Sequence, residues 1–342
     1  MSKPVLVGIC NPLLDVSAQV PLEVFEQWGV QNGQAILAAD QHQPLYAKLQ
    51  NDYKVEYIAG GAGQNTIRAF SWMTGVPKKG AYIGSVGDDE NGKKLREAAE
   101  KDGVDVHYYV KEGVPTGSCA VLVHERERAL IARLGAAEHY NKSHFESEEI
   151  QGLLKGAEFF YATSFVLTHS PNVILSMGQL AAEHNKVLSI NISAAFLVQF
   201  FWEKLEPVIR YADLIFANEV EAAALGEKLG WGSDLKEIAR KLGEYEKENK
   251  KRTRTVVFTQ GAQETIVYHN GQVTSFQPLK IAVERIVDTN GAGDSFVGGF
   301  LSKFVDGKTT DESVAAGHYC ASECIQLSGA TLPPTNKFSY SQ

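Results

Sequence analysis

The nine residues DTNGAGDSF, positions 288–296, decide how the rest of this sequence is interpreted. The apolar stretch 295–304 follows them directly, which predicts a helix that begins at this turn. Gly291 and Gly293 allow backbone conformations that other residues disfavour, so several amides at the helix start can point at one place. Because the helix dipole adds positive potential there, the stretch predicts an anion site suited to a transferring phosphoryl group.

Asp294 follows the two glycines, at the edge of this predicted anion site. A carboxylate in that position can accept the proton of an attacking hydroxyl. The alternative is that Asp294 only caps the helix, but the glycines on both sides of Ala292 favour the catalytic interpretation. The stretch is neither a P-loop nor a dinucleotide fingerprint. Ser302 replaces the upstream glycine that Gly307-Lys308-Thr309 would need, and Phe296 replaces the third glycine of the fingerprint.

The composition is that of a globular protein. The 342 residues are 44% hydrophobic, enough for a large core, and the net charge of −8 argues against a nucleic-acid surface. No run approaches the length of a membrane span, and the four cysteines have the spacing of neither a disulfide framework nor a metal site. The short apolar run near Met1 does not fit a signal peptide, so we expect a cytosolic protein, with nuclear entry left open. We also expect a monomer.

Short apolar runs alternate with helical stretches over most of the chain. This pattern predicts βαβ units and a mainly parallel sheet covered by helices. The expected strands are 4–10, 80–86, 159–162, 187–190, 214–217 and 255–259, and the expected helices include 65–73, 89–102, 294–306 and 311–326. A hairpin is expected at 263–276, around Asn270-Gly271. Runs 104–110, 118–124 and 129–134 follow one another at short spacing and suggest a small β subdomain.

Three motifs together carry a resemblance to a known family. Residues 288–294 resemble the C-terminal signature of the ribokinase-like carbohydrate kinases, in which the last aspartate is the base. Residues 60–65, GGAGQN, resemble the N-terminal signature, and 218–221, NEVE, resemble the N-x-x-E motif. The likeness covers essentially the whole chain. It implies a three-layer α/β/α body, at 1–12, 60–113 and 138–342, and a small β-rich lid, at 13–59 and 114–137.

Further segments are similar to the branch of this family that phosphorylates adenosine. They are 11–15, 115–120, 191–196, 199–201 and 317–319. The likeness implies that the γ-phosphate of ATP passes to the 5′-hydroxyl of adenosine, giving AMP and ADP, with Mg²⁺ as cofactor. One rival is a kinase for a free sugar, which would need more polar partners than these segments offer. The other is a non-catalytic nucleoside-binding protein, which the intact motifs disfavour.

The resemblance also implies a role for each matching residue. Asp294 would be the base, the amides of Gly291, Ala292 and Gly293 the anion site, and Arg128 the lid residue that reaches the phosphate. Asp15 would bind the ribose hydroxyls, since a carboxylate accepts two hydrogen bonds. The substrate set is Asn11, Leu13, Asp15, Leu37, Gly60, Gly61, Asn65, Cys119, Leu134, Phe165, Phe196 and Asn290. The nucleotide set is Asn218, Glu221, Thr259, Gly261 and His318. Glu221 would position Mg²⁺ through water, and Asn290 and His318 would lie near the base of ATP.

Several of these roles have simpler alternatives. Asp15 could end a strand in a turn, the apolar residues could be ordinary core, and Arg128 could be a solvated charge. Two positions also depart from the family pattern. Ala62 stands where many relatives carry serine, and Val166 stands where an aromatic residue is common.

Overall fold

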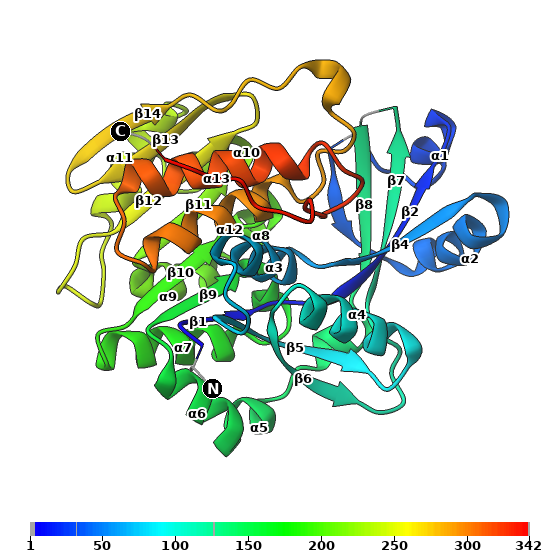
Figure 1. The fold of residues 1–342 in the computed structure, drawn as a ribbon, viewed down its shortest axis with the longest axis horizontal. Coiled ribbons are helices and arrows are strands. Elements are labelled where there is room, and N and C mark those ends of the chain that lie inside the picture. Colours follow the sequence, from blue (N-terminus) through cyan, green and yellow to red (C-terminus); the bar gives the residue numbers. More distant parts are fainter. Residues whose placement is uncertain (1–3, 32, 126, 341–342) are drawn as a thin grey trace.

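The structure is a computed structural model that describes residues 4–31, 33–125 and 127–340. Its body is built on a nine-stranded sheet (Figure 1). The strand order is β14 (Gln272–Phe276), β13 (Gln263–His269), β12 (Thr255–Gln260), β11 (Leu214–Asn218), β10 (Val187–Asn191), β9 (Phe159–Thr163), β1 (Leu6–Ile9), β5 (Gly80–Gly87) and β6 (Asp105–Lys111). Neighbours from β12 to β6 pair in parallel, whereas β13 and β14 are antiparallel. The predicted parallel sheet and the hairpin are both confirmed.

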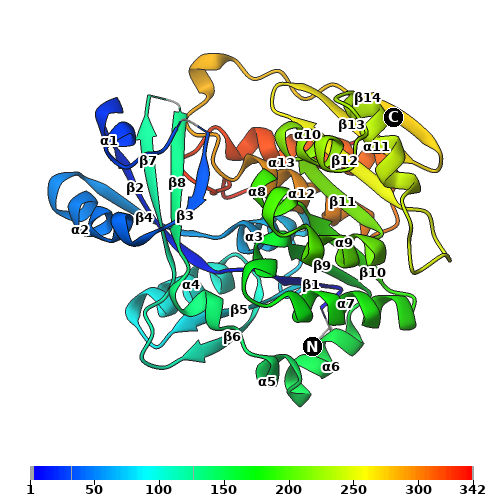
Figure 2. The ribbon, with the colours of Figure 1, turned by 180° about the vertical axis from the view of Figure 1, so that it is seen from behind.

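Helices cover both faces of this sheet. Figures 1 and 2 show α3, α12 and α13 over one face and α7, α9 and α10 over the other. The expected α/β/α sandwich is therefore confirmed. The helices of the body are α3 (Ala62–Thr74), α4 (Glu90–Lys101), α5 (Lys142–Phe145), α6 (Glu148–Gly156), α7 (Pro171–Glu183), α8 (Ala195–Phe200), α9 (Trp202–Tyr211), α10 (Glu219–Lys228), α11 (Leu235–Glu244), α12 (Ala292–Phe304) and α13 (Thr310–Cys324).

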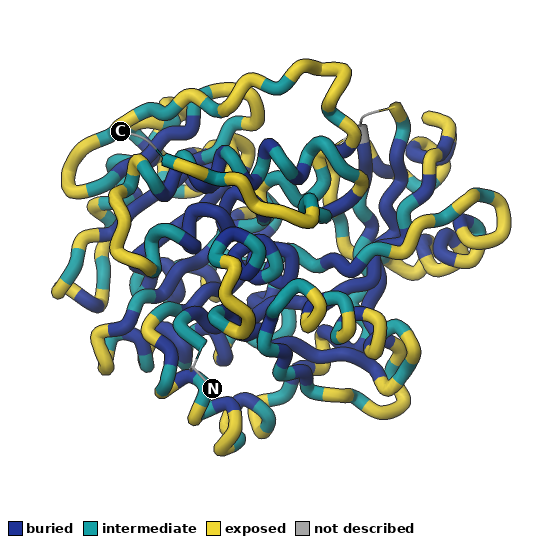
Figure 3. The backbone as a smooth tube through the Cα atoms, viewed as in Figure 1, coloured by how far each residue is buried: buried dark blue, intermediate teal, exposed yellow. Residues whose placement is uncertain are grey.

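The central strands form the core because both of their faces are covered. All residues of β1 and β5 are buried, as expected for apolar strands in a parallel sheet between helices. Figure 3 shows this buried backbone at the centre, with exposed segments confined to the outside. Among the described residues, no helix combines the length and apolarity that crossing a membrane requires.

One strand was grouped wrongly by the sequence pattern. The spacing of the run 104–110 groups it with the small β subdomain, whereas the family resemblance assigns 60–113 to the body. Strand β6 pairs in parallel with β5 at the edge of the large sheet, so the grouping by spacing is wrong. Buried and part-exposed residues alternate along β6, because an edge strand has only one well-covered face. The spacing misleads because only a short connection separates β6 from β7, although the two strands belong to different sheets.

A second sheet of five strands stands beside the body. Its order is β3 (Ala35–Leu37), β8 (Glu127–Arg133), β7 (Ser118–His124), β2 (Leu13–Gln19) and β4 (Val55–Gly60). Helices α1 (Leu22–Gln27) and α2 (Gln43–Asp52) cover one face, where Ala120, Leu122 and Ile131 belong to a small core. Because side chains alternate along a strand, Cys119 and Leu130 belong to a different apolar cluster, away from these helices.

Short 3₁₀ segments complete the architecture at Asp40–His42, Gly135–His139, Ser164–Thr168 and Val283–Arg285. The segment Ser164–Thr168 directly follows β9, so the chain turns at the carboxyl end of that strand. In sheets of this kind, the carboxyl ends of the parallel strands are where ligands bind.

Candidate active site

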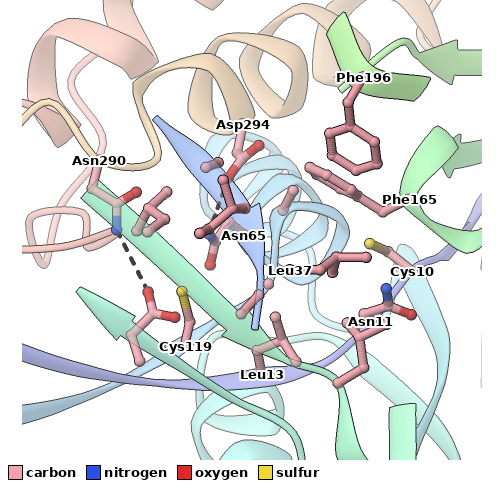
Figure 4. A pocket seen from close by; sticks show the side chains of 18 residues that line it. Cys10, Asn11, Leu13, Leu37, Asn65, Cys119, Phe165, Phe196, Asn290 and Asp294 are labelled. Carbon is pink, nitrogen blue, oxygen red and sulfur yellow. Dashed lines mark hydrogen bonds between the residues drawn. The ribbon is translucent and has the colours of Figure 1, made fainter. Parts of the chain in front are cut away.

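A first cavity lies between the second sheet and the carboxyl ends of the body strands (Figure 4). Strand ends contribute Cys10 and Asn11 after β1, and Phe165 after β9. The second sheet contributes residues of β2, β3, β7 and β8. The complete lining is Cys10, Asn11, Leu13, Asp15, Ala35, Ile36, Leu37, Gly61, Ala62, Asn65, Cys119, Leu130, Ala132, Leu134, Phe165, Phe196, Asn290 and Asp294.

A second cavity adjoins the first. Both are lined by Ala35, Ala62, Leu130, Phe165, Asn290 and Asp294. The second is otherwise lined by Asn191, Ser193, Phe216, Ala217, Asn218, Glu221, Thr259, Gly291, Gly293 and Val297. Asp294 therefore has access to two compartments, one mainly apolar and one that ends on the glycine turn.

Asp294 lies in the first turn of α12 but does not cap it. The N-cap is Gly291, three residues earlier, in the left-handed region with φ 75°. The capping alternative for Asp294 is therefore wrong. Asn65 Nδ2 donates a hydrogen bond of 3.0 Å to Asp294 Oδ2. Loss of solvation raises the pKa of this carboxyl to about 6, and the hydrogen bond from Asn65 opposes that shift.

The two glycines of the turn differ in what they require. A Cβ on Gly291 would lie 2.5 Å from the Cβ of Ala330, and its positive φ favours glycine independently. Gly293 has an ordinary φ, and a Cβ there would have no neighbour within 4 Å. A backbone conformation that favours glycine is therefore present at Gly291 and not at Gly293. At a helix start the amides of Gly293 and Asp294 have no intrahelical partner, so they remain available to an anion.

Asp15 lies inside β2 and points to the first cavity, so the alternative of a strand-ending turn is wrong. Its side chain is buried, and burial together with the charge of Asp294 raises its pKa to about 7. Asn290 Nδ2 lies 3.5 Å from Asp15 Oδ2, a contact drawn in Figure 4. A Cβ on Gly60 would collide with the Asp15 carboxyl, which explains a glycine there although Gly60 does not line the cavity.

Gly61 has a different constraint from Gly60. Its φ is 92°, and a Cβ would collide with the backbone oxygen of Asn11. The close approach brings the start of α3 against the end of β1. Asn65, one turn into α3, is thereby held where it reaches Asp294.

Asn218 and Glu221 form a reciprocal cap at the start of α10. Asn218 Oδ1 accepts from the Glu221 amide at 2.8 Å, and the two carboxylate oxygens of Glu221 accept from Asn218 N and Nδ2, each at 3.0 Å. Burial raises the pKa of Glu221 to about 7. Because each oxygen already accepts a hydrogen bond, this carboxylate suits a hydrated cation better than direct ligation. Within the described ranges no cluster of three His, Cys, Asp or Glu could hold a metal.

Arg128 is buried and forms an ion pair with Asp288, the first residue of the glycine motif. The alternative of a solvated charge is therefore wrong. Asp288 also accepts from the amides of Asn290, at 2.5 Å, and Gly329, at 2.8 Å. The ion pair joins β8 of the second sheet to the turn that precedes Asp294.

Some predicted residues line neither cavity. These are Gly60, Arg128, Gly261, Ala292 and His318. His318 is buried, its Nε2 lies 2.8 Å from Thr265 Oγ1, and its ring packs 5.4 Å from that of Phe296. Burial lowers its pKa to about 4. Its assignment to the base of ATP stays a prediction.

Sequence reasoning also missed several lining residues. They are Cys10, Ala35, Ile36, Leu130 and Ala132 in the first cavity, and Asn191, Ser193, Phe216, Ala217 and Val297 in the second. Strand alternation would have found Leu130 and Ala132, which lie two residues apart on β8. Asn191 and Ser193 belonged to a recognised segment but received no role.

Comparison with known proteins places this geometry in context. A model of the pfkB family of carbohydrate kinases matches residues 29–337. An adenosine kinase from Dictyostelium discoideum is 46% identical over 323 residues, which are 94% of this chain and 95% of that protein. The crystal structure of Anopheles gambiae adenosine kinase with P1,P4-di(adenosine-5) tetraphosphate superposes with a TM-score of 0.96 at 40% identity, covering 99% of this chain and 100% of that one. Adenosine kinase from Schistosoma mansoni in complex with 2-fluoroadenosine gives a TM-score of 0.94 at 30% identity, covering 97% and 98% of the two chains.

Proposed function

The chain belongs to the pfkB family of carbohydrate kinases, and on that basis we propose that it transfers the γ-phosphate of ATP to the 5′-hydroxyl of adenosine. The products are AMP and ADP. The observation that carries the proposal is the position of Asp294 in the lining of both cavities. A base at the junction can meet a hydroxyl from one compartment and a phosphoryl group from the other.

The first cavity suits a nucleoside better than a free sugar. Leu13, Leu37, Phe165 and Phe196 supply apolar and aromatic surface for a planar base, and the Phe165 and Phe196 rings lie 6.3 Å apart. Polar groups gather elsewhere in the cavity, where Asp15 lies 3.5 Å from Asn290. An ionised Asp15 accepts two hydrogen bonds, as paired ribose hydroxyls require.

We assign the chemistry to Asp294 and the turn before it. Asp294 removes the proton of the 5′-hydroxyl as that oxygen bonds to phosphorus. The first-turn amides of α12 stabilise the charge that develops on the phosphoryl oxygens. Asn65 donates to Asp294 Oδ2, which leaves Oδ1 to accept the proton.

The second cavity is assigned to the phosphates of ATP. Asn218, Glu221 and Thr259 line it together with Gly291 and Gly293. Glu221 would hold Mg²⁺ through water, since both its oxygens already accept hydrogen bonds from Asn218. Held there, Mg²⁺ would offset the negative charge of the phosphates.

The second sheet is proposed to act as a lid, with residues 13–59 and 114–137 moving against the rest. Closure would exclude water, which could otherwise receive the phosphoryl group. For Arg128 to reach the phosphate, it would exchange its ion pair with Asp288 for one with the nucleotide. Two anions competing for one guanidinium would couple lid position to nucleotide binding.

The test is ADP release from ATP and Mg²⁺ with adenosine, inosine, ribose or fructose as the acceptor. Turnover is expected to be fastest with adenosine, and the nucleoside product should be AMP. A higher kcat/KM for ribose or fructose would indicate a sugar kinase. Calorimetric binding of adenosine without ADP release from any acceptor would indicate a non-catalytic nucleoside-binding protein.

A further inference from the structure

Asn11 is a polar residue in the apolar part of the first cavity. It follows β1, its side chain is buried, and Figure 4 shows it on the same side of the view as Leu13, Leu37 and Phe165, away from Asp294. A primary amide presents either a donor or an acceptor, according to which way it is turned. Whatever fixes that rotation also decides which atom of a base the cavity accepts.

His169 fixes the Asn11 amide from behind. It lies between the 3₁₀ segment after β9 and the start of α7, and its Nε2 is 2.9 Å from Asn11 Oδ1. The other ring nitrogen, Nδ1, is 2.9 Å from Ser170 Oγ. Among residues 4–31, 33–125 and 127–340, no hydrogen-bond acceptor for Asn11 Nδ2 is found.

Because Asn11 Oδ1 faces the ring, the direction of its hydrogen bond with His169 follows from the chemistry of the two groups. An amide oxygen only accepts, so His169 must carry its proton on Nε2 and donate to Asn11 Oδ1. Nδ1 then has a lone pair, and the Ser170 hydroxyl has two acceptors within reach, Nδ1 at 2.9 Å and the Tyr140 carbonyl at 3.2 Å. Burial lowers the pKa of His169 to about 4, so the ring is neutral at physiological pH.

We propose that His169 is a positioning residue that determines base specificity, by holding Asn11 so that its Nδ2 donates into the first cavity. This inference rests on the proposed function. A fixed donor in an apolar wall selects a base with an unprotonated ring nitrogen at that position. It rejects a base with a hydrogen there, because two donors would face each other without water.

The experiment compares His169→Leu, His169→Gln and wild type, with KM and kcat measured for adenosine. His169→Leu removes the donor and frees the amide, so KM should rise about fivefold to tenfold with kcat nearly unchanged. His169→Gln retains a donor and should return KM to within about twofold of wild type. His184→Leu is the matched control, because His184 is exposed at the other end of α7 and should change neither constant.

Two further measurements separate positioning from a structural role. In an Asn11→Leu background, His169→Leu should add nothing to KM, because the group it orients is absent. The third comparison uses 1-deaza-, 3-deaza- and 7-deazaadenosine. The wild type should bind one of these analogues more weakly than adenosine, whereas His169→Leu should bind that analogue and adenosine equally well. Equal effects of His169→Leu with and without Asn11, or a loss confined to kcat, would overturn the proposal. Absence of wild-type turnover with adenosine would instead refute the function on which it rests.

Discussion

Gly291 and Gly293 stand two residues apart in one turn, and the structure predicts opposite outcomes when each is replaced by alanine. At Gly293 the φ is ordinary and a Cβ has no neighbour within 4 Å, so Gly293→Ala should stabilise the fold by about 0.4–1 kcal/mol. The open space beside Gly293 is where the proposed function puts the transferring phosphate. Turnover should therefore fall about 10²–10³-fold, the usual loss when one preorganised donor is displaced.

Gly291→Ala should destabilise the fold, in contrast to Gly293→Ala. A side chain at φ 75° costs about 1–2 kcal/mol, and a Cβ only 2.5 Å from Ala330 Cβ adds an overpacking penalty of about 1–3 kcal/mol. The free energy of unfolding should thus drop by about 2–5 kcal/mol.

Urea denaturation and steady-state turnover on both variants test this pair. Adenosine should still bind to Gly293→Ala, because Asp15 and Asn65 belong to β2 and α3. A stable Gly293→Ala enzyme with wild-type turnover would show that the turn is only a helix start and not an anion site.

The remaining predictions concern the charged groups of the site. Asp15→Ala should weaken adenosine binding about 10- to 100-fold in calorimetry and leave ATP binding unchanged, because it removes a charged acceptor; equal use of adenosine and 2′-deoxyadenosine by the wild type would contradict this role. The kcat/KM for adenosine should fall in two steps as the pH drops, first through about 7, where Asp15 and Glu221 gain a proton, and then through about 6, where Asp294 does; a profile without the second step would count against Asp294 as the base. The raised pKa also means that Asp294 contributes stability below about pH 4 and loses it as pH rises through 6, so Asp294→Asn should melt above the wild type at pH 8 and level with it at pH 4. Arg128→Met should lower the free energy of unfolding by about 3–5 kcal/mol, because buried Asp288 loses its guanidinium, and an unchanged urea midpoint would show that the ion pair adds no stability.

The sequence predicted those parts of the fold in which local signals agree with tertiary structure. The buried strands and the helix after the glycine turn were found because their apolar runs are continuous and their boundaries carry turn residues. Strands β2 and β4 were not expected. Asp15 interrupts the apolar pattern of β2 from inside, and much of β4 is exposed, so neither strand alternates clearly.

Site residues were predictable where a motif names them, and their environments were not. Asp294 and Asn65 were chosen from separate motifs, and the hydrogen bond between them joins positions 229 residues apart. The resemblance predicts Arg128 as a cation for phosphate, but it could not predict the ion pair with Asp288, because that contact depends on how the second sheet meets the body. The φ of each glycine is likewise set by the turn. The residue type alone therefore could not reveal that Gly291 has a positive φ, which favours glycine, and that Gly293 does not.

The role proposed for His169 could not be predicted from the sequence. Nothing in its neighbourhood along the chain suggests a role, because Asn11 is 158 residues away. The hydrogen bond becomes visible only when the carboxyl ends of β1 and β9 are brought together by parallel pairing.

In the proposed reaction, Asp294 accepts the proton of the 5′-hydroxyl of adenosine. Asp294→Asn retains the size and the contact with Asn65 but cannot accept that proton. With ATP and Mg²⁺ at pH 7.5, kcat should fall about 10²–10⁴-fold, and calorimetry should show adenosine bound as tightly as by the wild type. A folded Asp294→Asn protein that retains near-normal kcat would show that Asp294 is not the base.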